Sequence, residues 1–112
     1  VPHNEETHRL VDAEVFGKLR PHTLLLNGSR GAVVEEDALI DVLEAKRLGG
    51  AWLDVFEQEP LAAESPLWQM ENVIVTPHSA DQVADFPFRF AQFFADNLER
   101  YAQGDELLNV VW

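Results

Sequence analysis

Three apolar runs are each followed by polar side chains that could act together on a carbonyl compound. The runs lie within TLLLN (23–27), GAWL (50–53) and NVIVTP (72–77). In an open parallel sheet, ligands bind beyond the carboxyl ends of the strands, so three such strands would bring these groups to one edge. The groups are Arg30 after the first run, Asp54, Glu57 and Glu59 after the second, and His78 and Asp81 after the third.

The chemistry that these residue types fit is carbonyl reduction or its reverse. A histidine exchanges a proton near neutral pH, and a neighbouring carboxylate orients the ring and favours its protonated form. An arginine such as Arg30 can hold a substrate carboxylate with two parallel hydrogen bonds and polarise the adjacent carbonyl. The glycines on either side of it, Gly28 and Gly31, would let a flat ligand approach the backbone.

Each residue alone also has a simpler explanation. Arg30 could be a surface residue or half of a structural ion pair, and Glu59 could be a solvated loop acid. Asp54 could accept backbone N–H groups, and His78 could cap the next helix. The coincidence of all three groups at one edge favours a shared site over three separate explanations. The remaining histidines lie in polar flanks and receive no role: His3, His8 and His22.

The elements that would position these groups follow from hydrophobic periodicity. Strands buried on both faces are predicted within 22–27, 50–56 and 72–78. Helices are predicted within 11–21, capped by Asp12, and within 35–50, with Lys46 and Arg47 in its last turn and a glycine pair at its end. A longer amphipathic helix is predicted within 86–104. The fold class is therefore α/β, half of a doubly wound, Rossmann-type parallel sheet followed by a C-terminal amphipathic helix.

The composition limits which partners, which cellular compartment and which metal sites are expected for this protein. The 112 residues carry a formal net charge of -12, which disfavours nucleic acids and anionic membranes as partners. There is no cysteine and no apolar run long enough to cross a bilayer, so a cytoplasmic protein without a thiolate metal site is expected. No metal ligand set is assigned. The chain starts in a polar segment without an initiator methionine, which suggests a piece of a larger protein.

The segment LLLNGSRGAVVEEDALIDVLEAKRLGGAWLDVFEQEPLAAESPLW, followed by NVIVTPH, closely resembles the NAD-binding domain of the D-isomer-specific 2-hydroxyacid dehydrogenases. The resemblance extends over essentially the whole chain. It implies that residues 1–103 form the C-terminal part of an NAD(P)-binding Rossmann-like domain and that 104–112 form a C-terminal tail. No G-x-G-x-x-G is present, so the phosphate-binding turn and the substrate domain are expected to lie outside this chain.

The resemblance also implies individual roles. Arg30 would bind the 2-oxo acid, Glu59 rather than Glu57 would pair with His78, and His78 would be the general acid–base. Asp54 would hold the nicotinamide carboxamide, and Gly28 and Ser29 would line the cofactor. The residues expected to contact the cofactor are Val1, Pro2, Thr7, Gly28, Ser29, Arg30, Asp54, His78 and Asp81.

Three positions depart from the pattern of the family. Asp81 stands where the family often has a glycine, Trp52 stands where a small residue is usual, and Gly28 replaces a more usual alanine or threonine. The departures concern the pocket and its substrate rather than membership of the family.

The function implied is hydride transfer between NAD(P)H and a small 2-oxo acid such as glyoxylate, hydroxypyruvate or pyruvate. Two alternatives stay open: an NAD-sensing binding protein of the corepressor type, or an inactive folded fragment. A fragment would expose an edge strand and an apolar sheet face, so the partner expected is a second copy or the missing part of its own chain.

Overall fold

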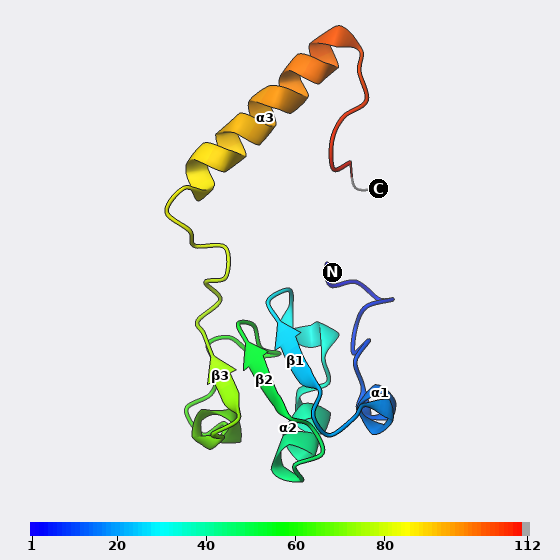
Figure 1. Cartoon of the computed structure of the whole chain (residues 1–112), viewed down its shortest axis with the longest axis vertical. Coiled ribbons are helices and arrows are strands. Elements are labelled where there is room, and N and C mark those ends of the chain that lie inside the picture. Colours follow the sequence, from blue (N-terminus) through cyan, green and yellow to red (C-terminus); the bar gives the residue numbers. More distant parts are fainter. Residues whose placement is uncertain (111–112) are drawn as a thin grey trace. The chain divides into compact units, whose positions relative to one another are not determined.

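The computed structural model describes residues 1–110 and divides into two compact units, Val1–Ala80 and Asp81–Trp112 (Figure 1). The first unit contains the sheet and the second contains the long helix. Each unit is described by itself.

The first unit is built on a parallel three-stranded sheet in the order β1-β2-β3. The strands are β1 (Leu24–Asn27), β2 (Gly50–Leu53) and β3 (Val73–Val75), and their arrowheads point the same way in Figure 1. Helix α1 (Ala13–Lys18) precedes β1, helix α2 (Glu36–Glu44) joins β1 to β2, and the short helix η2 (Pro66–Gln69) lies between β2 and β3. The predicted α/β class with a parallel sheet is confirmed.

The two early helices begin near the predicted residues, but α2 ends earlier. The Asp12 side chain caps α1 by accepting a hydrogen bond from Val15 N at 2.9 Å, as predicted. Helix α2 was expected to continue through Lys46 and Arg47 to the glycine pair, and this is wrong. Lys46 takes the left-handed conformation at φ 53°, and the amides of Lys46 and Arg47 donate back to the carbonyls of Leu43 and Val42. This closes the helix before any glycine is reached.

The core of the first unit lies on one face of its sheet only. It includes Leu39, Val42 and Leu43 of α2 with Ala51 and Leu53 of β2. The strands predicted to be buried on both faces are therefore buried on one face within this unit, and the other is the apolar face that a fragment was expected to expose. The opposite face carries Leu24 and Leu26, which are 65% and 67% exposed, and Ile74, which is 63% exposed.

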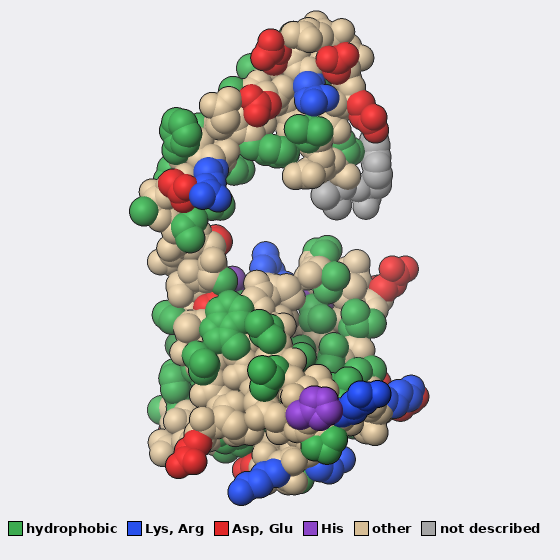
Figure 2. Space-filling model, in the orientation of Figure 1, with side chains coloured by type: hydrophobic (Ala, Val, Ile, Leu, Met, Phe, Trp, Pro, Cys, Tyr) green, Lys and Arg blue, Asp and Glu red, His purple; other side chains and the backbone are tan. Residues whose placement is uncertain are grey.

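The exposed face has a defined register because residues of the three strands pair laterally. Leu26 lies opposite Trp52, and Trp52 lies opposite Ile74, so these three side chains form one row across the sheet. Figure 2 shows hydrophobic side chains gathered over this part of the first unit. Within residues 1–80 no element covers the row, which is the open apolar face expected of half a doubly wound sheet.

The second unit is the helix α3 (Phe86–Gln103) and the segment after it. Pro87 lies in the first turn, where a proline is tolerated, and Gly104 ends the helix in the left-handed conformation at φ 78°. One face carries exposed apolar side chains at helical spacing: Phe86, Phe90, Phe93, Phe94, Leu98 and Tyr101. No helix among the described residues has the length and the apolar content needed to span a bilayer.

Candidate active site

His78 and Glu59 form the central pair of the candidate site. His78 Nδ1 lies 2.7 Å from Glu59 Oε2, and the other oxygen of that carboxylate accepts a hydrogen bond from Phe56 N at 3.1 Å. The carboxylate is thus fixed by its own loop on one side and orients the imidazole on the other. Both side chains remain partly exposed, at 48% for His78 and 36% for Glu59, so the second ring nitrogen can meet a ligand.

Glu57, the other glutamate of the loop, has a different partner. Its carboxylate lies 3.6 Å from Arg9 Nε, and its amide donates to Glu36 Oε2 at 3.1 Å. Arg9 also pairs with Glu35 across 3.4 Å, so this cluster joins the N-terminal segment to the start of α2. The geometry therefore assigns the histidine partner to Glu59 and gives Glu57 a structural role.

Asp54 fixes the backbone that follows His78. It is 1% exposed at the end of β2, and its Oδ1 accepts hydrogen bonds from the Thr76 hydroxyl and from Ser79 N at 3.0 Å. Its Oδ2 accepts from Ala80 N at 2.8 Å. His78 itself adopts φ 51°, a left-handed conformation that is uncommon for residues other than glycine. The bonds on both sides of it hold the residue in this conformation.

Asn27 fixes the loop that carries Arg30. The buried Asn27 side chain donates to Arg30 O at 3.1 Å and accepts from Ser29 N at 3.2 Å and from the Ser29 hydroxyl at 3.1 Å. Arg30 is exposed, and among residues 1–80 its guanidinium donates a hydrogen bond to the carbonyl of Ser29 and forms no ion pair. A structural ion pair therefore does not account for this arginine, and its charge is available to an anion.

The two glycines beside Arg30 serve different purposes. A Cβ on Gly31 would lie 1.9 Å from the carbonyl carbon and oxygen of Phe56, so Gly31 is small because two backbone segments touch. The expectation that Gly31 clears space for a ligand is wrong. Gly28 is exposed and borders the ring of Trp52 and the methyl group of Ala80, so it lies at the surface where a ligand could approach.

The N-terminal residues proposed for the cofactor form their own small turn. Thr7 donates its hydroxyl to Pro2 O at 2.7 Å, and its amide donates to the side chain of Asn4 at 2.9 Å. Val1 is exposed. The hydrogen bonds of this turn join its own residues, so the contact of Val1, Pro2 and Thr7 with the cofactor stays a prediction. Asp81 is the first residue of the second unit, and its carbonyl accepts a hydrogen bond from Val83 N at 2.9 Å.

Two pKa shifts follow from this arrangement. The hydrogen bond from His78 is the largest effect on Glu59 and lowers the pKa of that carboxyl below its ordinary value of 4.5, with Phe56 N adding to it. For Asp54, burial acts to raise the pKa, but the donors from Ser79, Thr76 and Ala80 together lower it below 3.8. Both carboxyls are therefore ionised at neutral pH. Glu59 can pair with an imidazolium, and Asp54 can accept hydrogen bonds in its buried position.

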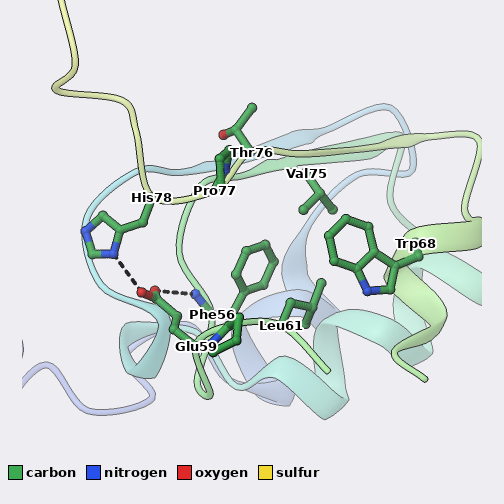
Figure 3. A pocket seen from close by; sticks show the side chains of 9 residues that line it. Phe56, Glu59, Leu61, Trp68, Val75, Thr76, Pro77 and His78 are labelled. Carbon is green, nitrogen blue, oxygen red and sulfur yellow. Dashed lines mark hydrogen bonds and ion pairs between the residues drawn. The ribbon is translucent and has the colours of Figure 1, made fainter. Parts of the chain in front are cut away.

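A cavity of about 620 Å³ lies against the pair (Figure 3). Figure 3 shows Glu59 and His78 at one end, with Phe56, Leu61, Trp68 and Val75 forming an apolar wall beyond them. The apolar wall reduces contact of the carboxylate with water on that side, which strengthens its interaction with the imidazole. Among residues 1–110, no group of three or more histidine or acidic side chains is arranged to bind a metal ion.

Several residues that build the site carried no clear signal in the sequence. Thr76, which donates to Asp54, precedes a proline at the end of a predicted strand, and nothing in that position predicts a side-chain partner. Asn27 ends an apolar run, and only the glycine after it is typical of an asparagine that bonds to its own loop. Arg9 had no visible partner, because Glu35 and Glu57 are distant in the sequence.

Comparison with known proteins assigns the family. The model of the D-isomer specific 2-hydroxyacid dehydrogenase NAD-binding domain matches residues 1–80. This chain belongs to that family. It is 41% identical over 111 residues to glyoxylate/hydroxypyruvate reductase B of Shigella boydii, covering 99% of this chain and 34% of that protein. The chain thus spans about a third of the length of the curated relatives that it matches.

Solved structures of the family have the same fold. The D-isomer specific 2-hydroxyacid dehydrogenase of Xanthobacter autotrophicus, in complex with NADPH and MES, matches with a TM-score of 0.83 and 41% identity over 100% of this chain and 46% of that chain. The NADPH-dependent glyoxylate/hydroxypyruvate reductase of Sinorhizobium meliloti, in complex with NADP and sulfate, matches with a TM-score of 0.82 and 34% identity over 99% of this chain and 36% of that chain. The predicted family, fold class and type of cofactor are confirmed.

Proposed function

We propose that this chain is the catalytic part of the cofactor domain of an NAD(P)H-dependent 2-oxo acid reductase. The observation that carries the proposal is the 2.7 Å contact between His78 and Glu59 in a member of the 2-hydroxyacid dehydrogenase family. An imidazole oriented by an ionised carboxylate suits proton transfer to a carbonyl oxygen at neutral pH.

In this proposal each side chain has one task. The exposed guanidinium of Arg30 binds the carboxylate of the 2-oxo acid and draws electron density from the neighbouring carbonyl. His78 donates a proton from its outer ring nitrogen to the carbonyl oxygen, and Glu59 stabilises the protonated ring before that transfer. The reduced nicotinamide, when bound, supplies the hydride to the carbonyl carbon. In the reverse direction His78 accepts the hydroxyl proton.

The residues at the strand ends fit a nicotinamide cofactor. Gly28 and Ser29 leave an open backbone surface at the end of β1, and Asp54 Oδ2 accepts one hydrogen bond, so it retains an acceptor position beyond the Ala80 amide. The contact of Asp54 with the carboxamide stays a prediction, as do the contacts of Val1, Pro2, Thr7 and Asp81. In the described contacts Asp54 acts through the backbone by holding Ser79 and Ala80 beside His78.

The relatives indicate the substrate class. The proteins named above include two glyoxylate/hydroxypyruvate reductases, one of them described as NADPH-dependent. We extend this to the present chain as a reductase of small 2-oxo acids, with glyoxylate and hydroxypyruvate as the first substrates to test.

The domain boundaries and the partner also belong to the proposal. Residues 1–103 would form the C-terminal part of the cofactor domain, with 104–112 as a tail and with the phosphate-binding turn and the substrate domain supplied by the rest of the protein. The uncovered row of Leu26, Trp52 and Ile74 supports further elements or a second copy packing on the sheet, and a homodimer is the expected assembly.

The test compares His78→Ala with His22→Ala in the complete protein. We expect His78→Ala to lower kcat for glyoxylate by roughly a hundredfold or more while the Kd for NADPH stays within about twofold, because general acid catalysis contributes on that scale. His22 is exposed outside the site, so His22→Ala should leave both values unchanged. Unchanged turnover in His78→Ala would refute the assignment. Tight NADPH binding by the unaltered protein without turnover of any 2-oxo acid would favour the sensor alternative.

A further inference from the structure

Two of the departures from the family pattern, Gly28 and Trp52, are in contact in the folded chain. A Cβ on Gly28 would lie 3.3 Å from Cζ3 and 3.5 Å from Cη2 of the indole, and 3.7 Å from the methyl group of Ala80. Carbon atoms pack best at about 3.5–4.0 Å, so a Cβ at this position would already be tight against the indole. A side chain larger than a methyl group at position 28 would have to displace the indole.

The backbone conformation does not explain the glycine at position 28. Among the described glycines only Gly104 has a positive φ, so Gly28 adopts a conformation open to other residues. Gly31 is small because it touches the Phe56 backbone, but the nearest atoms to a Cβ on Gly28 belong to side chains. The missing side chain at Gly28 is therefore matched to the large one at Trp52.

The indole reaches from the sheet to the loops of the candidate site. Trp52 lies in the middle strand between Leu26 and Ile74, on the open face of the sheet. Its ring edge extends past the end of β1 to Gly28, the first residue of the loop that carries Arg30. Ala80, whose methyl group also lies near Gly28, is held by its hydrogen bond to Asp54. The ring therefore lies against a fixed backbone rather than in open solvent.

We propose that Trp52 is a positioning residue for the cofactor, and that its indole replaces the side chain missing at Gly28 as the apolar wall beside the nicotinamide ring. This inference rests on the proposed function, because it places the nicotinamide over Gly28 and Ser29. A rigid aromatic edge offers a flat ring a larger apolar contact than the methyl group of an alanine or threonine at position 28 would. The two residues then depend on each other. Trp52 leaves no room for a side chain at position 28, and Gly28 without Trp52 would leave an unfilled space beside the nicotinamide ring.

The experiment is a double-mutant cycle in the complete protein with Gly28→Thr, Trp52→Met and the double variant. Gly28→Thr should raise the Kd for NADPH about tenfold when Trp52 is present and less than about threefold beside Trp52→Met, because interacting sites depart from additivity. Trp52→Met alone should raise the Kd and the KM for NADPH several-fold. A residue that only supports the fold would lower the thermal midpoint and leave the Kd of the folded protein unchanged.

A matched control uses Trp68→Met, because Trp68 lines the cavity beside Glu59 and does not touch Gly28. It should leave the effect of Gly28→Thr at tenfold. If the Gly28→Thr variant does not fold, Gly28→Ala takes its place, since its Cβ alone meets the indole at 3.3 Å.

Equal effects of the Gly28 substitution in both backgrounds would overturn the inference, as would an unchanged Kd in Trp52→Met. Such a result leaves the proposed function intact provided that His78→Ala still abolishes turnover. Unchanged turnover in His78→Ala would instead remove the proposed function, whatever the cycle shows.

Discussion

Replacing Gly31 by alanine should damage both the fold and the site, because no neighbouring side chain can move to make room. The new Cβ would lie 1.9 Å from the Phe56 carbonyl carbon and oxygen and 2.5 Å from Glu57 N. Ordinary contacts between such atoms are near 3.5 Å, so the Arg30 loop and the Glu59 loop would have to separate by about 1.5 Å. Overpacking against side chains costs about 1–3 kcal/mol, and we expect about 3–5 kcal/mol here because backbone must shift.

The same separation predicts a kinetic effect. Arg30 and Glu59 sit on the two segments that would move apart, and a misplacement of about 1 Å can cost roughly a hundredfold in rate. We therefore expect Gly31→Ala to lower kcat/KM for glyoxylate by about that factor at temperatures where the protein stays folded. The assays are denaturant unfolding, with urea as denaturant, and steady-state reduction of glyoxylate with NADPH.

Gly17→Ala is the matched control. Gly17 lies in α1, and a Cβ there would have no neighbour within 4 Å. Alanine is a better helix former than glycine, so this variant should be more stable by about 0.5 kcal/mol with unchanged kinetics. A Gly31→Ala protein as stable and as active as the Gly17→Ala protein would refute the reasoning about the two touching segments.

Three further predictions concern the pair, its support and the core. Replacing Glu59 by glutamine should remove the stability that the ionised carboxylate contributes, which is present above pH 4.5 and is lost as the pH falls through the lowered pKa of Glu59. The thermal midpoints of the variant and the unaltered protein should therefore converge in acid. A difference between the midpoints that stays constant with pH would contradict this. Thr76→Val should speed hydrogen exchange at Ser79 N and lower kcat about tenfold, whereas Thr76→Ser keeps the donor and should do neither. Leu39→Ala, at a side chain only 1% exposed, should cost about 2–5 kcal/mol in urea unfolding, and a smaller loss would mean that the core closes over the cavity.

Much of the fold follows from local signals. The cap at Asp12, the apolar face of α2 and the glycine that ends α3 depend on neighbours a few residues away, and all three were predictable. The end of α2 was not, because Lys46 adopts a left-handed conformation that is uncommon outside glycine and has no signature in composition.

The candidate site was predictable in its charged residues and less so in its supports. Strand ends located Arg30, Asp54 and His78, and the resemblance selected Glu59 before its contact with the histidine could be seen. The supports depend on contacts between distant segments: Thr76 bonds to a residue 22 positions away, and Gly31 meets the Phe56 backbone. Hydrophobic periodicity does not reveal contacts between segments that are distant in the sequence. What covers the open face of the sheet could not be predicted for a related reason, since apolar residues show which faces need cover but not which segment supplies it.

The hydrogen bonds that Asp54 accepts from the amides of Ser79 and Ala80 affect the free energy of ligand binding. The backbone around a catalytic histidine is often a mobile loop whose ordering opposes association with the ligand. Here the residue is tied on one side to β3 and on the other to a buried carboxylate, so the loss of conformational entropy occurs when the chain folds. The affinity for a ligand at His78 then carries a smaller ordering cost from this backbone segment.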